Sequence, residues 1–277
     1  MTFDGDKNRN VERLMKRYKA LLVTGASSGI GKEIAYGLAP QAEQVVLVAR
    51  RSDKLEALAQ DISLRFGTKA FALAADLSVS GNAQTVFEKF IELVGCPPDI
   101  LVNDAGAGFC GEAAELSVEA EAQMLRLNME SLMVLCKLAL KTMYARRKGV
   151  ILNVASMGGF QPGPYMAAYF ASKAFVLSYS EALAEESRLH GVRVLTLCPG
   201  SVDTNFHALA GSKRGFLRYF FSSTPQQVAW EAVRAILSGF PNVVVPGYSN
   251  KAILLAERFL PRRLVTILSG KLLKPRR

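Results

Sequence analysis

Histidine and cysteine are scarce in this chain of 277 residues, and neither is clustered. The two histidines are His190 and His207. The four cysteines lie far apart, at Cys96, Cys110, Cys136 and Cys198. No C-x-x-C pair occurs, so the sequence offers no ligand set for a structural zinc ion, and we expect no metal. Scattered cysteines are typical of a reducing compartment, which predicts a cytoplasmic protein.

Long hydrophobic runs are also missing. A membrane-spanning helix needs about 18 or more apolar residues, and the longest apolar stretches here fall well short of that length. The first ten residues are polar, so no secretory signal is visible. With 50% hydrophobic and 21% charged residues, the composition excludes intrinsic disorder and a coiled coil.

The positive net charge is confined to the two ends of the sequence. Of the total of +10, residues 1–20 contribute +3 and residues 251–277 contribute +7, so the part between them sums to zero. A protein that binds nucleic acid usually spreads basic residues over a face of its fold. The charge distribution therefore indicates an enzyme-like body and no nucleic-acid partner.

Short apolar runs alternate along the chain with amphipathic stretches of helical period. We expect strands at 20–23, 45–48, 70–75, 100–102, 150–154, 192–198 and 242–245. We expect helices at 30–38, 53–66, 79–94, 118–146, 167–189 and 225–238. Runs that are apolar throughout indicate strands buried on both faces. The pattern predicts a single α/β domain, with a parallel sheet of about seven strands and helices on both faces.

A glycine-rich segment, T-G-A-S-S-G-I-G at Thr24–Gly31, follows the first expected strand and opens a helix. Glycine lets the backbone approach a pyrophosphate closely, and the helix N-terminus favours its negative charge. This context favours a dinucleotide-binding turn. A tight strand–helix connection without a ligand is the alternative.

Two further segments fit a bound dinucleotide. The second expected strand ends in Arg50 and Arg51, where an acidic residue would bond the ribose hydroxyls of NAD. Guanidinium groups pair well with a 2′-phosphate, which predicts NADP(H) as the cofactor, unless both arginines are simply solvated. Asp76 ends the third strand and could bond adenine or cap the following turn.

Four residues form a possible catalytic set. Tyr169 and Lys173 lie four apart in an expected helix, so they share a face. An ammonium near the phenol lowers its pKa from about 10, so the tyrosine can exchange a proton with a carbonyl or alcohol oxygen. Ser156 follows a strand, and Asn128 lies inside the long helix, where a bent backbone would let a water link it to Lys173. Taken singly, the pair could be a surface pair and Asn128 an exposed residue.

Together these motifs resemble the short-chain dehydrogenases/reductases over about residues 18–248. The matching segments are T-G-A-S-S-G-I-G at Thr24–Gly31, Asp76-Leu77, N-D-A-G at Asn103–Gly106, Asn128, Ser156, Y-F-A-S-K at Tyr169–Lys173 and P-G-S-V-D-T at Pro199–Thr204. The resemblance implies a Rossmann-like, doubly wound domain.

The resemblance also implies a role for each matching residue. Tyr169 is the general acid/base, and Lys173 lowers its pKa and binds the nicotinamide ribose. Ser156 orients the substrate carbonyl, and Asn128 holds a proton-relay water. The implied cofactor-binding residues are Gly25, Ser27, Ser28, Gly29, Ile30, Gly31, Arg50, Arg51, Asp76, Leu77, Asn103, Ala105, Gly106, Tyr169, Lys173, Pro199, Gly200, Val202 and Thr204.

The chain departs from the family pattern at one position. Asp104 replaces the second Asn of N-N-A-G, which we expect to affect a local turn contact but not cofactor binding. Ser28 stands where some members carry a basic residue, so the preference for NADP(H) rests on Arg50 and Arg51. The surrounding V-L-V-A-R-R is similar to NADP(H)-using bacterial-type members.

Outside the motifs, we divide the chain into a basic N-terminal arm (1–17), the main domain (18–250) and a basic C-terminal extension (251–277). Residues 205–224 are rich in aromatic side chains and are expected to form a substrate lid, or else a short core helix. Tyr165 and Met166 are expected to face the same pocket.

The extension carries an apolar stripe at helical spacing, formed by Leu264, Ile267, Leu268 and Leu272. Three interpretations stay open. The stripe could contact an acidic membrane surface, form a subunit interface or a cover over the cleft, or pack on its own domain.

The sequence thus predicts an NADP(H)-dependent oxidoreductase that interconverts an apolar ketone or aldehyde and its alcohol. One alternative is a dinucleotide-binding sensor or scaffold without turnover, and another is a membrane-surface reductase of lipid-like carbonyls. The resemblance implies a homodimer or homotetramer.

Overall fold

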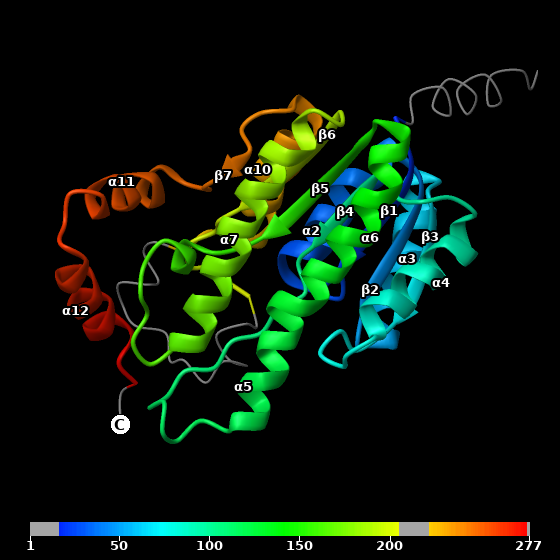
Figure 1. Cartoon of the computed structure of the whole chain (residues 1–277). Coiled ribbons are helices and arrows are strands. Elements are labelled where there is room, and N and C mark those ends of the chain that lie inside the picture. The colour runs from blue at the N-terminus through cyan, green and yellow to red at the C-terminus, as the bar shows by residue number, and fades with distance from the viewer. Residues whose placement is uncertain (1–16, 205–221, 276–277) are drawn as a thin grey trace, which may run out of the picture.

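The computed structural model describes residues 17–204 and 222–275. In these residues one parallel sheet has seven strands, as the sequence predicts, and their order is β3-β2-β1-β4-β5-β6-β7 (Figure 1). The strands are β1 (Tyr18–Thr24), β2 (Ala42–Ala49), β3 (Lys69–Ala74), β4 (Ile100–Asn103), β5 (Gly149–Val154), β6 (Val192–Leu197) and β7 (Val243–Val244). The order reverses between β1 and β4, as in a doubly wound fold.

Helices cover both faces of the sheet. The helices are α2 (Gly29–Leu38), α3 (Ser52–Phe66), α4 (Asn82–Val94), α5 (Val118–Leu125), α6 (Ser131–Arg146), α7 (Ala167–Arg188), α10 (Pro225–Ser238), α11 (Tyr248–Glu257) and α12 (Arg262–Leu273). Short turns are η1 (Ala39–Gln41), the π-helical η2 (Arg126–Glu130) and η3 (Met157–Gly159). One apolar core joins the sheet to α2, α3 and α10, and a second joins it to α4, α6 and α7.

Local chemistry explains where several helices begin and end. Helix α3 ends at Gly67, whose φ of 60° lies in the left-handed region that glycine adopts without strain. Helix α10 begins with a capping box, in which Thr224 and Gln227 each bond the other's backbone N–H. None of the helices in the described part of the chain is long and apolar enough to cross a membrane.

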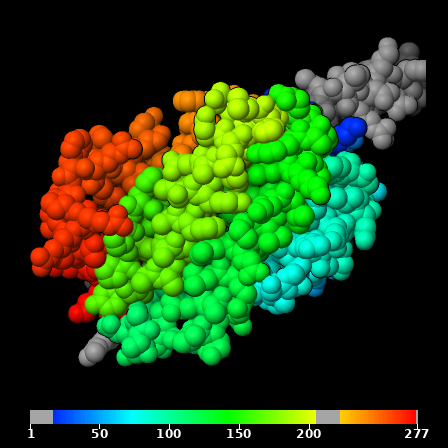
Figure 2. Space-filling model, in the orientation of Figure 1, coloured from blue at the N-terminus to red at the C-terminus, as the bar shows by residue number. Residues whose placement is uncertain are grey.

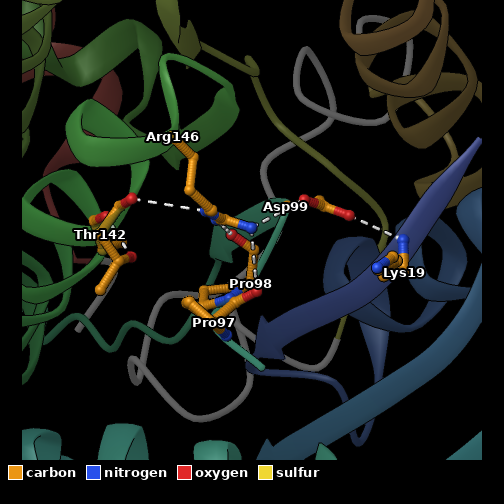
Figure 3. Close-up of polar contacts among 7 residues, drawn as sticks. Lys19, Pro97, Pro98, Asp99, Thr142 and Arg146 are labelled. Atoms are coloured by element: carbon orange, nitrogen blue, oxygen red, sulfur yellow. Dashed lines mark hydrogen bonds and ion pairs between the residues drawn. The ribbon is translucent and has the colours of Figure 1, made fainter. Parts of the chain in front are cut away.

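At the amino end of β4, a polar network ties three elements together (Figure 3). The buried Asp99 accepts a hydrogen bond of 2.7 Å from the backbone N–H of Lys19 and pairs at 3.1 Å with Arg146, the last residue of α6. Arg146 also donates to the carbonyl of Pro98 at 2.8 Å. The network satisfies a buried carboxylate and fixes β1, β4 and α6 at the end of the sheet away from the glycine turn.

Candidate active site

A cavity of about 1180 Å³ lies at the carboxyl ends of the parallel strands. Ligands bind at this edge in open α/β sheets, where the strand order reverses. Most residues predicted for the site line the cavity: Gly25, Ser27, Ser28, Gly29, Ile30, Arg50, Arg51, Asp76, Leu77, Ala105, Gly106, Ser156, Tyr169, Lys173, Pro199, Gly200, Val202 and Thr204. Three others, Gly31, Asn103 and Asn128, lie behind the lining.

The glycine turn fits tightly against the segment that follows β4. A Cβ atom on Gly25 would lie 2.8 Å from the backbone nitrogen of Ala105, and one on Gly31 would lie 2.6 Å from Oδ2 of Asp104. Gly25 and Gly29 also have φ values of 71° and 64°. Only glycine meets both conditions, so the turn exposes backbone N–H groups at the start of α2, as a pyrophosphate requires.

Asp104, which stands in place of the second Asn of the family motif, contacts the glycine turn. Its Oδ2 accepts a hydrogen bond of 2.8 Å from the backbone N–H of Gly31. An aspartate and an asparagine both offer a side-chain oxygen, so the contact between the end of β4 and α2 is made. The side-chain hydroxyl of Thr24 accepts from the backbone N–H groups of Asp104 and Ala105, each at 3.2 Å, and holds the same turn.

The two arginines lie where the cavity meets the glycine turn. Nη2 of Arg51 donates to the hydroxyl oxygens of Ser27 and Ser28, both at 2.9 Å. Asp76 accepts from the backbone and hydroxyl of Ser78 at 2.9 and 2.7 Å, so it caps its own turn while lining the cavity. Burial opposes ionisation of Asp76, but the Ser78 hydrogen bonds and the charge of Arg50 together lower its pKa.

Tyr169 and Lys173 are on one face of α7 and both line the cavity. The Lys173 side chain is buried, and its Nζ donates to the carbonyl of Val154 at 2.8 Å, at the end of β5. Nζ lies 5.9 Å from the centre of the Tyr169 ring. The alternative of a solvated surface pair is therefore wrong, because a strand end fixes the lysine beside the phenol.

The ammonium of Lys173 and the carboxyl of Asp104 perturb one another. Burial lowers the pKa of Lys173 to about 8, and the negative charge of Asp104 limits that fall. Burial raises the pKa of Asp104 to about 7, against the opposing effects of Lys173 and the Gly31 N–H. In its ammonium form Lys173 can stabilise a phenolate at Tyr169.

Asn128 is buried, which excludes the alternative of an exposed residue. The long helix expected over 118–146 is interrupted there by the π-helical η2, the local distortion that we expected. The Asn128 amide accepts from the backbone N–H of Ala107 at 3.0 Å and donates to the carbonyl of Ala107 at 2.9 Å and to the hydroxyl of Ser172 at 3.0 Å.

Asn128 and Lys173 meet at one glycine. A Cβ atom on Gly106 would lie 3.3 Å from Oδ1 of Asn128 and 3.5 Å from Nζ of Lys173. A side chain at this position would therefore press on both the amide and the amine. The relay water between the two side chains stays a prediction.

Ser156 and Asn103 lie on different sides of the cavity lining. Ser156 lines the cavity, and its hydroxyl oxygen accepts from the backbone N–H of Gly158 at 3.0 Å. Asn103, expected to line the cleft, is instead buried behind it, where its amide donates to Asn153 at 2.9 Å and to the sulfur of Cys136 at 3.4 Å. Asn103 is the last residue of β4, and its side chain packs into the core that contains Cys136.

The C-terminal helices form a wall of the cavity that our residue list did not include. The lining residues from this region are Asn250, Ile253, Ala256, Glu257, Leu260, Val265, Leu268, Ser269, Lys271, Leu272, Leu273, Lys274 and Pro275. The hydroxyl of Ser269 donates to the carbonyl of Pro162 at 2.8 Å, and Gly270 packs against Pro164. Of the interpretations of the extension, α12 thus fits both a cover over the cleft and a helix packed on its own domain.

The first residue of this wall, Asn250, packs against Gly200 in the cavity lining. A Cβ atom on Gly200 would lie 2.6 Å from the side-chain oxygen of Asn250. Asn250 is buried, and its amide nitrogen donates to the carbonyl of Pro246. Met166 also lines the cavity, but Tyr165 is absent from the lining. Most of the expected lid, residues 205–221, lies outside the described residues, as does the N-terminal arm up to residue 16.

Comparisons with known proteins agree with this geometry. The family model described as short chain dehydrogenase matches residues 19–215. A very-long-chain 3-oxoacyl-CoA reductase from Phaeosphaeria nodorum is 36% identical over 176 residues, which cover 62% of this chain and 52% of the relative. The match thus spans about half of that relative.

Solved structures are similar over most of the chain. A short-chain dehydrogenase from Sphingobium yanoikuyae in complex with NADPH has a TM-score of 0.76 and 28% identity, covering 87% of this chain and 93% of that one. A 7β-hydroxysteroid dehydrogenase has a TM-score of 0.82 and 26% identity, covering 92% and 98%. The matched sequence model, the strand order and the site geometry agree: the chain belongs to the short-chain dehydrogenase/reductase family of oxidoreductases.

Proposed function

We propose that this protein is an NADP(H)-dependent reductase that interconverts an apolar ketone or aldehyde and its alcohol. The observation that carries the proposal is that one cavity holds Tyr169 and Lys173 between a pair of arginines and an apolar wall. The glycine turn, which has no room for a Cβ at Gly25 or Gly31, fits a dinucleotide pyrophosphate. NADPH, when bound, supplies the hydride.

The side chains divide the remaining chemistry among them. Tyr169 gives its hydroxyl proton to the carbonyl oxygen, and the charge of Lys173 stabilises the phenolate left behind. Because the Ser156 oxygen already accepts from Gly158, its own hydrogen is available to donate to the same carbonyl oxygen. A water held between Lys173 and Asn128, both of which lie beside Gly106, would give the proton a return path.

The far wall of the cavity supports an apolar substrate. It is formed by Met157, Met166, Phe170, Ile253, Leu260, Val265, Leu268 and Leu272. Such a wall excludes water around the reacting carbonyl. Relatives and structural neighbours named for very-long-chain 3-oxoacyl and hydroxysteroid compounds agree with a large apolar substrate. The homo-oligomeric state, the cytoplasmic location and the division at 17 and 250 stay predictions.

The first test is turnover by the purified full chain. With NADPH and a panel of bulky apolar ketones, we expect loss of NADPH absorbance and formation of the alcohol. Tyr169→Phe keeps the ring but removes the proton, so kcat should fall by about 10²–10⁴-fold with little change in NADPH affinity. Turnover near the wild-type rate in that variant would refute the mechanism. Tight NADPH binding with no turnover across the panel would instead favour a dinucleotide sensor.

The second test addresses the cofactor preference. A charge-assisted hydrogen bond to the 2′-phosphate contributes about 1.5–3 kcal/mol, so Arg51→Ala should raise the KM for NADPH about 10- to 100-fold and leave that for NADH nearly unchanged. Arg65→Ala, an exposed arginine at the far end of α3, is the matched control and should alter neither KM. An equal loss with both cofactors in Arg51→Ala would show that the arginine only orders the turn.

A further inference from the structure

Helices α11 and α12 expose an unusual amount of apolar surface. Phe259, in the turn between the two helices, is 81% exposed, and Leu272 and Leu255 on the helices are 69% and 59% exposed. The further exposed apolar side chains are Leu260 in the same turn and, on the helices, Ile253, Leu264, Ile267 and Leu268. The helices lie together at one end of the molecule, away from the sheet (Figures 1 and 2). So many exposed apolar side chains on two neighbouring helices and their connecting turn indicate an interaction site rather than single scattered exposure.

The same helices carry almost exclusively positive charge. From Tyr248 to Pro275 the basic side chains are Lys251, Arg258, Arg262, Arg263, Lys271 and Lys274. The single acidic residue in this stretch is Glu257, which lines the cavity and whose Oε2 is buried without a hydrogen-bond partner in the described structure. The outward surface of α11 and α12 therefore combines apolar side chains with cations.

We propose that the outward surface of α11 and α12 docks on an anionic lipid surface. Apolar side chains that insert at the headgroup boundary, flanked by arginines and lysines that meet acidic headgroups, are the two features by which an interfacial helix binds such a membrane. A second copy of this chain is a poorer partner, since a two-fold interface would bring two basic surfaces together.

The position of the cavity gives this docking a consequence. Ile253, Leu260, Leu268 and Leu272 line the cavity and are also exposed, so they form its mouth on the docking side. Lys271 and Lys274 lie at the same mouth. An apolar substrate would then pass from the lipid into the cavity without crossing water. This substrate route rests on the proposed reductase function, whereas the docking itself does not.

The experiment is co-sedimentation of the full chain with vesicles of phosphatidylcholine, with and without phosphatidylserine. We expect binding that needs phosphatidylserine and weakens with salt, since the attraction is electrostatic. Arg262→Glu/Arg263→Glu should lower the partition coefficient by about fivefold or more for each charge lost. Phe259→Ser/Ile267→Ser should lower it at least as much, because both apolar side chains leave the contact.

Matched controls come from the rest of the surface. Lys89→Glu/Lys148→Glu changes exposed cations elsewhere, and Leu64→Ser/Leu189→Ser removes side chains that are 86% and 69% exposed on other elements. Both controls should bind vesicles as the wild type does. Neither Phe259 nor Ile267 lines the cavity, so NADPH turnover of a soluble ketone by the docking variant reports that it is folded.

Three results would overturn the proposal. The full chain could fail to bind anionic vesicles, or the docking variants could bind as well as the controls. Alternatively, size-exclusion chromatography without lipid could show an oligomer that Phe259→Ser/Ile267→Ser dissociates, which would assign the surface to a second copy. None of these readouts depends on turnover, so loss of docking and loss of the proposed reductase activity are separable.

Discussion

Strand β4 has an aspartate immediately beyond each of its ends, and the two carboxyl groups are held in opposite ways. Asp99, at the amino end, pairs with the guanidinium of Arg146 and accepts from the Lys19 N–H. Asp104, at the carboxyl end, accepts from the Gly31 N–H, and burial raises its pKa to about 7. At the amino end, the buried carboxylate of Asp99 thus has a cation and a backbone donor. At the carboxyl end, burial disfavours the charged forms of both Asp104 and Lys173.

The difference indicates that the charges at the amino end of β4 stabilise the fold, whereas those at the carboxyl end serve the reaction. A carboxylate with a guanidinium partner and backbone donors holds segments together. A lysine whose pKa burial lowers to about 8 is costly to fold, but it is the group that can act on a neighbouring phenol at neutral pH. Substitutions at the two ends should therefore separate loss of rate from loss of stability.

The largest effect is expected at the carboxyl end. Lys173→Met keeps the aliphatic volume but removes the charge beside Tyr169, so kcat/KM should fall by about 10²–10⁴-fold. The variant no longer buries an ammonium, but the carbonyl of Val154 loses its donor, so these effects oppose one another and the free energy of unfolding should change little. Steady-state kinetics and urea unfolding of the same preparation check both parts. If Lys173→Met lost stability but kept its rate, the carboxyl end of β4 would serve stability rather than the reaction.

At the amino end the order of effects should invert. Arg146→Met leaves the buried carboxylate of Asp99 without its cation, and we expect a loss of about 2–4 kcal/mol in the free energy of unfolding with kcat nearly unchanged. Arg188→Met is the matched control. Arg188 also ends a helix and pairs with an acid, but both partners are largely exposed, so about 1 kcal/mol or less is expected. Equal losses in the free energy of unfolding of the two variants would show that the Asp99 network stabilises the fold no more than an exposed ion pair does.

Much of the fold could be predicted because the strands are buried on both faces. Their runs are apolar throughout, and the expected strands at 45–48 and 150–154 lie within β2 and β5. The order of motifs also predicted which side chains gather at the cavity, since the carboxyl ends of parallel strands meet at one edge of the sheet.

What the sequence could not predict depends on which partner each side chain has. The stripe containing Leu264 and Leu268 predicts a helix correctly, but it is Val265 and Ser269 that are buried against the body, and the stripe is partly exposed. Helical spacing identifies an apolar face without identifying what covers it. In the same way, the motif that contains Asn103 gave no sign that this side chain points into the core behind the cavity.

The smallest effect should be seen in the pH dependence of stability. The pKa of Asp104 is about 7 in the folded protein and about 4 in an unfolded chain. Its contribution to stability is therefore complete below the unfolded value and is lost as the pH rises through the folded one. Between about pH 5 and pH 7 the wild type should lose about 1–2 kcal/mol that Asp104→Asn does not lose. Urea unfolding at the two pH values measures the difference.

Lys173→Met identifies the group that titrates. Removing the ammonium takes away a charge that holds the pKa of Asp104 down, so the loss of stability should extend to higher pH in that variant. The double variant with Asp104→Asn should show neither the loss nor its shift, because the carboxyl group is gone. If Asp104→Asn keeps the same pH dependence of stability, the titrating group is another residue. Asp104 would then no longer differ from Asp99 by its effect on that pH dependence.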